Sequence, residues 1–156
     1  MDEREQEILT GFRAGLDCGQ LVLLPFAERL GLTEAEALRM TASLGYGMFR
    51  GETCGAAAAA MLAIGLRFGP ARAGDDESKG ELMRRLEQFQ RRFTERCGST
   101  LCRERLPGYD FGQEGALERA LADGVIFRDC PAAILTAREL LEELLQPKQK
   151  KRDYTA

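Results

Sequence analysis

Apolar side chains recur at spacings of three and four residues along this chain, and glycines separate one such stretch from the next. Ile8, Phe12 and Leu16, for example, fall on one face of a helix. No stretch alternates apolar and polar side chains over enough residues to form a sheet. We therefore predict an all-α fold, a single compact bundle of about six to seven helices within residues 1–146.

Capping residues and helix breakers place the ends of these helices. Thr33 and Glu36 have the spacing of a capping box, which starts a helix. Pro25 is expected to divide the second helix because it lacks a backbone N–H, and Pro131 suits the first position of the last one. The expected helices cover residues 3–16, 18–30, 34–44, 54–68, 78–97, 113–123 and 129–144, with a short helical segment at Cys102.

Two stretches are rich in small residues. Residues 56–60 are five consecutive alanines, and Thr53 can cap the helix that contains them. Small side chains let neighbouring helices approach closely, so we expect this helix to be the central one. Residues 45–51 contain three glycines, which indicates a backbone in unusual conformations or pressed close to another group.

Charge and composition narrow the range of partners and compartments. The 22 basic and 25 acidic residues are mixed along the chain, so no patch indicates binding to nucleic acid or to an anionic membrane. The first seven residues lack the basic start and apolar stretch of a signal peptide, and the apolar run at residues 56–66 is too short to span a bilayer. We expect a cytoplasmic protein with a basic, disordered tail at residues 147–156.

Four of the five cysteines stand at predicted helix N-termini: Cys18, Cys54, Cys102 and Cys130. A helix N-terminus offers unpaired N–H groups and a partial positive charge, and both stabilise a thiolate. The sequence contains no histidine, which excludes Cys-His and Ser-His-Asp catalysis and histidine-ligated metals. Four such cysteines therefore predict a site that holds negatively charged sulfur.

Cys97 differs from the other cysteines because it lies near the end of a helix, where the dipole disfavours a thiolate. We interpret it as a bystander or core cysteine. Its nearness to Cys102 leaves an alternative, a fifth thiol that resolves or replaces a ligand.

The order Cys18, then Cys54-Gly55-Ala56, then Cys102, then Cys130 resembles the family of putative redox-active proteins written C_GCAxxG_C_C. The resemblance extends over about residues 10–145, and Ala59 stands where the motif has its final glycine. It implies a redox role for the four cysteines. A similar module accompanies haem groups in some split-Soret cytochromes with a suspected iron–sulfur centre, so the resemblance favours a cluster.

Our first hypothesis is an electron-transfer protein that holds an iron–sulfur cluster, [2Fe–2S] in type, on the four cysteines as metal ligands. Gly47, Gly51 and Gly55 would surround this cofactor and bring backbone N–H groups close to its sulfurs. An unidentified redox partner protein would exchange electrons with it.

Two alternatives remain open. A metal-free thiol–disulfide enzyme or redox sensor would use Cys54 as its catalytic nucleophile, because Cys54 starts the central helix. A structural zinc site or a non-redox interaction module with inert cysteines is the other alternative, although zinc ligands usually stand closer in sequence. The apolar helical faces are also compatible with a homodimer.

Overall fold

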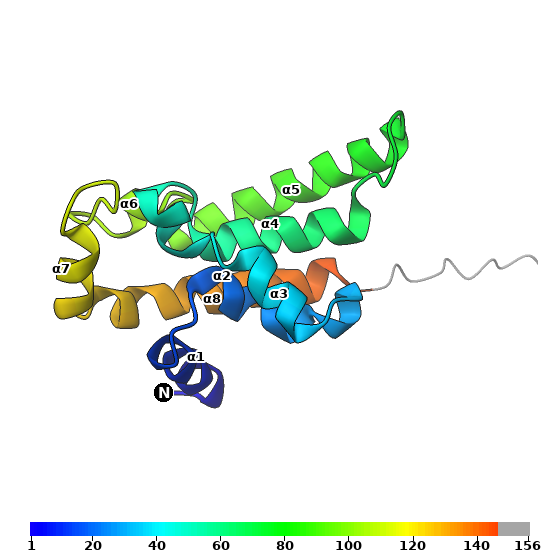
Figure 1. The fold of residues 1–156 in the computed structure, drawn as a ribbon. Coiled ribbons are helices and arrows are strands. Elements are labelled where there is room, and N and C mark those ends of the chain that lie inside the picture. Colours follow the sequence, from blue (N-terminus) through cyan, green and yellow to red (C-terminus); the bar gives the residue numbers. More distant parts are fainter. Residues whose placement is uncertain (147–156) are drawn as a thin grey trace, which may run out of the picture.

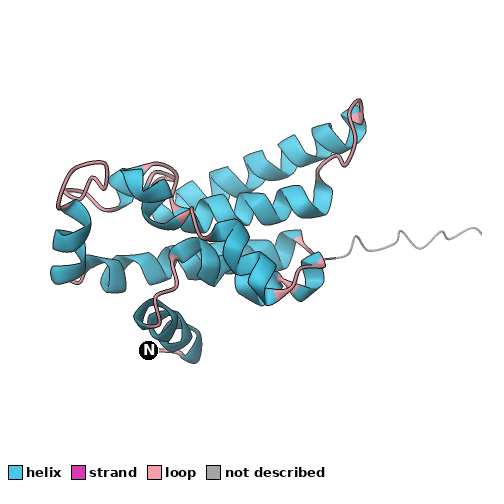
Figure 2. Cartoon of the chain, viewed as in Figure 1, coloured by secondary structure: helices cyan, strands magenta, loops and turns pink. Residues whose placement is uncertain are grey.

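The computed structural model describes residues 1–146, which form helices joined by loops (Figure 1). The tail predicted at residues 147–156 lies outside this part of the chain. Figure 2 shows no strand among the described residues, so the all-α prediction is confirmed. The helices are α1 (Glu3–Arg13), α2 (Cys18–Leu23), α3 (Glu34–Thr41), α4 (Gly55–Phe68), α5 (Asp76–Cys97), α6 (Cys102–Arg105), α7 (Ala116–Ala122) and α8 (Val125–Leu144), with short turns η1 (Leu24–Phe26), η2 (Glu28–Leu30) and η3 (Gly47–Gly51).

Helix α4 is central, as its run of alanines predicts. It packs against α2, α5 and α8, and Figure 1 shows it between α5 on one side and the layer of α2 and α8 on the other. Small side chains on the buried faces let the helix axes approach closely. The fully buried alanines of this helix are Ala56, Ala57, Ala59, Ala60 and Ala63.

Several helix ends follow the predicted capping and breaking residues. The Glu36 N–H donates to Thr33 Oγ1 over 3.1 Å, the Thr33 N–H donates to Glu36 Oε2 over 2.8 Å, and α3 starts at the next residue, Glu34. The predicted helix at residues 18–30 is divided at Pro25, where α2 gives way to η1 and η2. Helix α5 starts earlier than predicted, because the Asp75 carboxylate accepts the Ser78 N–H over 3.1 Å and caps the preceding turn.

The start of α8 corrects the prediction that Cys130 lies at a helix N-terminus. The helix begins at Val125, after Gly124 in a left-handed conformation, and Cys130 lies in its second turn. Val125 and Ile126 are buried, and their burial supports the added turn. Pro131 therefore lies inside the helix, where it has no N–H to donate to the Phe127 carbonyl.

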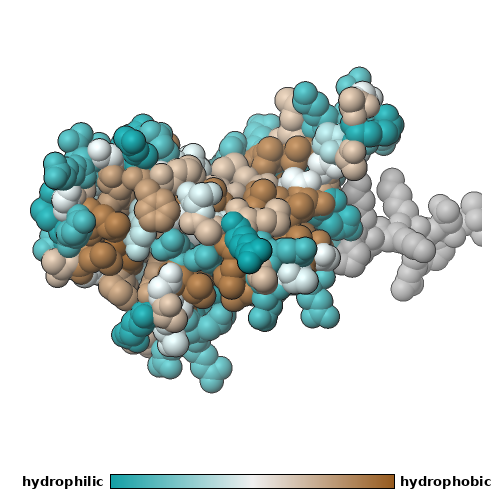
Figure 3. All heavy atoms as spheres, viewed as in Figure 1, coloured by the Kyte–Doolittle hydropathy of each residue, from teal (hydrophilic) through white to brown (hydrophobic). Residues whose placement is uncertain are grey.

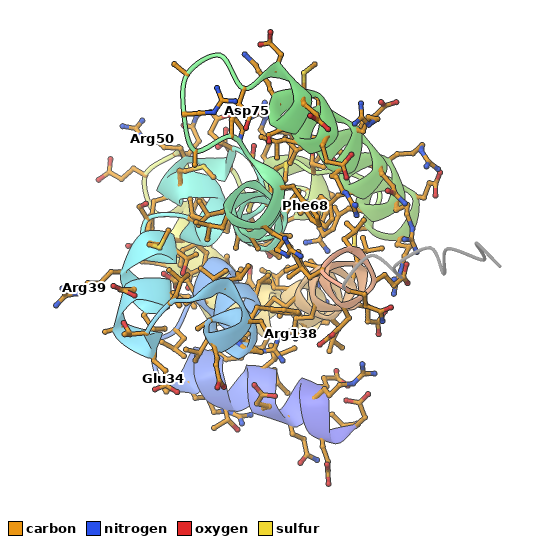
Figure 4. All side chains as sticks on the ribbon, turned by 90° about the vertical axis from the view of Figure 1, so that its right-hand side faces the viewer. Glu34, Arg39, Arg50, Phe68, Asp75 and Arg138 are labelled. Carbon is orange, nitrogen blue, oxygen red and sulfur yellow. The ribbon has the colours of Figure 1, made fainter. Side chains whose placement is uncertain are left out.

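An arginine fixes α8 against α2 next to the first cysteine. Arg138 donates to the Leu21 carbonyl from Nε over 2.9 Å and from Nη2 over 2.6 Å, and it also pairs with Glu7 of α1. Its side chain lies between the elements drawn in blue and the end of α8 in Figure 4. Three helices are thus tied together on the side of the bundle that carries Cys18.

Apolar side chains also reach the surface. Leu66 and Met40 are both more than a third exposed, and Figure 3 shows apolar residues along the middle of one face of the molecule with charged residues around them. Homodimer formation through such a face stays a prediction. Within residues 1–146, no helix combines the length and the apolar character needed to cross a membrane.

Candidate redox centre

Four cysteines from four different helices are buried in the core. Cys18 is the first residue of α2, Cys54 is the N-cap of α4, Cys102 is the first residue of α6, and Cys130 lies within α8. Their exposed fractions are 6%, 4%, 7% and 5%. The prediction of cysteines at helix N-termini is thus confirmed for three of the four.

The four thiols lie close enough together to influence one another. The pKa of Cys18 is raised by its interaction with the Cys130 side chain and by burial, and negative charge on Cys54 and Cys102 raises it further. Cys102 in turn feels charge on Cys54 and Cys130. Cys97, the last residue of α5, is only partly buried. Residues that are far apart in the sequence therefore form one cluster, the cysteine centre of Cys18, Cys54, Cys102 and Cys130.

Two backbone hydrogen bonds hold Cys54 beside Cys102. The Cys54 N–H donates to the Thr100 carbonyl, and the Cys102 N–H donates to the Glu52 carbonyl, each over 2.7 Å. Between them lies the antiparallel bridge of Thr53 with Leu101. This short pairing aligns the segment before α4 with the segment before α6, so that both helices start at the cysteine centre.

Glycines permit the close approach of backbone to the cysteines. A Cβ atom added to Gly55 would lie 2.5 Å from the Leu44 carbonyl oxygen and 3.4 Å from Cys18 Cβ. One added to Gly47 would lie 2.9 Å from Cys102 Cβ. Any larger residue would push these segments away from the cysteines. Gly51 lies against Asp110 and Arg103 instead, and a cofactor-binding role for the three glycines stays a prediction.

The turn η3 has a left-handed backbone over consecutive residues. Tyr46, Met48 and Phe49 have φ values of 51°, 56° and 57°, and Gly47 between them has 62°. Left-handed conformations cost about 1–2 kcal/mol for each residue that has a Cβ atom. Ring contacts of Tyr46 with Phe49 and Phe111, at centroid distances of 5.5 and 5.4 Å, help to hold this turn. The glycine content of residues 45–51 predicted an unusual backbone conformation. It did not predict that three residues with larger side chains, Tyr46, Met48 and Phe49, would adopt the left-handed conformation.

Tyr46, the residue before this turn, lies close enough to the cysteine centre for the charges there to affect its phenol. Its phenol is half-buried, and its pKa rises to about 12 because of burial first and then because of the negative charges of Asp17, Cys18 and Cys130. The phenol therefore keeps its proton in the folded protein across the neutral pH range and well above it. Sequence reasoning missed this residue, although its place among the glycines of residues 45–51 is a signal that could have found it.

Arg105 is a second residue that sequence reasoning missed. Its Nη1 lies 3.8 Å from Cys54 Sγ, and its Nε and Nη2 donate to the carbonyls of Cys97 and Asp129, each over 3.4 Å. Arg105 stands three residues after Cys102 on α6, a spacing that places both on one side of a helix. It supplies a half-buried positive charge to the cysteine centre.

The four thiols are not equivalent electrostatically. Burial raises the pKa of Cys102 to about 12 and also raises that of Cys54, although Arg105 and backbone N–H groups oppose the rise at Cys54. The interaction between the side chains of Cys18 and Cys130 raises the pKa of Cys18 and lowers that of Cys130. Arg105 further lowers the pKa of Cys130. The preferred position for a thiolate is therefore Cys130.

Four thiolates are a suitable donor set for an iron–sulfur cluster or for zinc. Among residues 1–146, however, no three cysteine or acidic side chains lie in an arrangement that could hold a metal ion. The four thiols are therefore the right type of ligand for a metal or cluster, but their sulfurs do not have the spacing that such a group needs.

Comparison with known proteins identifies one family. The family model C_GCAxxG_C_C, described as putative redox-active protein, matches residues 16–144. Neither the curated proteins nor the solved structures contain a match to the chain. The matched segment runs from just before Cys18 to the end of α8 and contains the entire cysteine centre. The chain belongs to the C_GCAxxG_C_C family of putative redox-active proteins.

Proposed function

We propose that this chain is a thiol–disulfide redox protein whose working couple is Cys18 and Cys130. The observation that carries the proposal is that Cys18 and Cys130 are buried together in the cysteine centre, where the interaction of their side chains raises the pKa of Cys18 and lowers that of Cys130. Such a pair combines the two groups that disulfide exchange requires, a thiolate that attacks and a neighbouring thiol that resolves the intermediate.

A small disulfide of the general form R–S–S–R is the oxidant class that this couple would accept. The Cys130 thiolate attacks one sulfur and forms a mixed disulfide, and the other R–S⁻ leaves and takes a proton from solvent. Cys18 then gives up its proton and attacks the Cys130 sulfur, which forms the Cys18–Cys130 disulfide and releases the second R–SH. One disulfide is reduced to two thiols, and two protein sulfurs are oxidised.

Burial limits what can reach these sulfurs. Both thiols are about 95% shielded from solvent, with exposed fractions of 6% and 5%, so a small oxidant fits the site better than a folded protein. The sequence pattern predicted Cys54 as the nucleophile, and that remains a prediction. The raised pKa of Cys54 and the lowered pKa of Cys130 favour Cys130 in this role.

The test is to equilibrate the reduced protein with a low-molecular-weight disulfide and to map the product by peptide mass spectrometry. We expect one intramolecular disulfide between Cys18 and Cys130, and none in Cys18→Ser or Cys130→Ser. Cys97→Ser is the matched control and should form the same disulfide. Exclusive pairing of Cys54 with Cys102, or full resistance to oxidation, would contradict the proposal.

A second candidate is an iron–sulfur centre held by Cys18, Cys54, Cys102 and Cys130. The burial of all four thiols beside Arg105 favours it, because electron transfer needs no direct access of a substrate to sulfur. Its test is anaerobic purification with a count of iron and labile sulfide. Matched iron and sulfide that are lost in Cys54→Ser, but kept in Cys97→Ser, would favour the cluster over the disulfide couple.

A further inference from the structure

A second feature of the molecule lies on the outer side of the turn η3. There the surface is hollowed into an open cavity of about 580 Å³. It is formed by η3, by α6 and by the loop that follows α6. Pockets of roughly 300–1,000 Å³ commonly hold small molecules. The residues that line the cavity are Met48, Arg50, Glu52, Arg103, Asp110 and Gly112.

Two arginines line this cavity, and only one of them is engaged within the described part of the chain. Arg103 Nη1 donates to the Gly51 carbonyl and to Glu52 Oε2, each over 3.3 Å. Arg50 has no hydrogen-bond or ion-pair partner among residues 1–146, and Figure 4 shows its side chain extending away from the helical bundle. The Arg50 guanidinium is therefore available to an anionic group in the cavity.

Asp110 supplies the complementary charge. Its Oδ1 accepts the Gly112 N–H over 2.9 Å, and the carboxylate forms no ion pair within the described residues. A Cβ atom added to Gly112 would lie 3.1 Å from Asp110 Oδ1 and 3.5 Å from the Arg50 carbonyl oxygen. Gly112 thus keeps open the space between the segments that carry Asp110 and Arg50. A positive and a negative side chain line one cavity without being paired to each other.

We propose that this cavity binds a free amino acid or short peptide through both of its charged ends. The ligand carboxylate would pair with Arg50, in the forked geometry that guanidinium groups favour, and its ammonium group would pair with Asp110. Met48 offers an apolar contact for the ligand side chain. A ligand with both charges can pair with Arg50 and Asp110 at once, whereas a simple anion or a simple cation would pair with only one of them.

The cavity and the cysteine centre share the segment at the start of α6. Arg103 directly follows Cys102, whose side chain is buried while that of Arg103 is exposed. The proposed binding does not depend on the chemistry of the cysteines, and it should persist in Cys18→Ser.

Isothermal titration calorimetry with the intact chain at low ionic strength tests the proposal. The probes are glycyl-leucine, N-acetyl-glycyl-leucine without the ammonium group, and glycyl-leucinamide without the carboxylate. We expect binding of the dipeptide, and binding at least about tenfold weaker for either blocked form. Arg50→Gln and Asp110→Asn should each weaken dipeptide binding about tenfold. Arg72→Gln, an exposed arginine between α4 and α5, should leave it unchanged.

The pattern across ligands and variants decides the outcome. Arg50→Gln should bind glycyl-leucinamide as well as it binds the dipeptide, and Asp110→Asn should bind the acetylated form as well as the dipeptide. These two results would support the assigned contacts. Equal binding of all three probes to the original chain would overturn the proposal, as would unaltered affinity in both variants. No measurable heat up to about 10 mM dipeptide would overturn it as well.

Discussion

Replacing Arg105 by glutamine removes a positive charge from the cysteine centre and keeps a polar side chain that can still donate hydrogen bonds. Two unit charges separated by 3.8 Å, the distance from Arg105 Nη1 to Cys54 Sγ, interact by about 4 kcal/mol at an effective dielectric constant of about 20. Arg105 also lowers the pKa of Cys130, so its loss should disfavour the Cys130 thiolate.

The positive charge of Arg105 lowers the pKa of Cys130 as well as that of Cys54. Solvent around the half-buried arginine screens this attraction, and a loss of about 1.4 kcal/mol corresponds to a rise of one unit in the pKa of Cys130. We therefore expect roughly a tenfold lower thiolate population of Cys130 at neutral pH in Arg105→Gln. The whole pH profile of Cys130 reactivity should move to higher pH, because a higher pKa delays loss of the proton.

The assay is the rate of alkylation by iodoacetamide as a function of pH, with each cysteine resolved by peptide mass spectrometry. Arg105→Lys should recover part of the rate because it restores the charge. Arg103→Gln, a matched control on the same helix, should leave the rate unchanged. If Arg105→Gln retains its fold and the Cys130 profile does not move, the assignment of Arg105 as the counter-charge is refuted.

Three further changes test the packing around the centre. Gly47→Ala should destabilise the fold by at least about 2 kcal/mol in urea unfolding, because Gly47 has a positive φ and an added Cβ atom would overlap its neighbours. Gly80→Ala, inside α5, should instead stabilise the fold by about 0.5–1 kcal/mol. Equal effects of the two substitutions would contradict the argument. The Tyr46 phenol binds its proton more tightly in the folded than in the unfolded protein, so the free energy of unfolding should fall as the pH rises from 10 to about 12. If Tyr46→Phe shows the same fall, Tyr46 is not its cause. Arg138→Gln should cost about 1.5–3 kcal/mol through the Leu21 carbonyl, and a shift in the urea midpoint measures it.

Local sequence chemistry predicted much of the frame around the cysteine centre. Asp17 precedes Cys18 at the start of a predicted helix, and α2 begins there in the structure. The prediction that Thr53 caps the helix expected at residues 54–68 is wrong, because Cys54 is the N-cap of α4 and Thr53 pairs with Leu101 instead. The alanines of α4 predicted close packing on several sides, which the contacts with α2, α5 and α8 confirm. These features are set by residues within one turn of each other, so a sequence pattern can reveal them.

Features set by distant contacts could not be predicted in this way. The preference of Pro131 for a first helical turn placed the start of α8 too late, because burial of Val125 outweighs the hydrogen bond that the proline removes. The role of Arg105 depends on α6 docking beside Cys54, which no local spacing encodes. The left-handed conformation of Tyr46 is likewise held by ring contacts with Phe111 from another part of the chain.

The pairing of Thr53 with Leu101 has a consequence for the order in which the molecule assembles. It closes a loop that contains all of α4 and α5. Closing a long loop costs more chain entropy than forming a contact between residues that are close in the sequence. Helices α4 and α5 follow each other in the chain and can dock before the bridge forms. A newly made chain would then acquire its helical hairpin first and bring Cys54 and Cys102 together afterwards, so its sulfurs would stay exposed to oxidants until the final stage of folding.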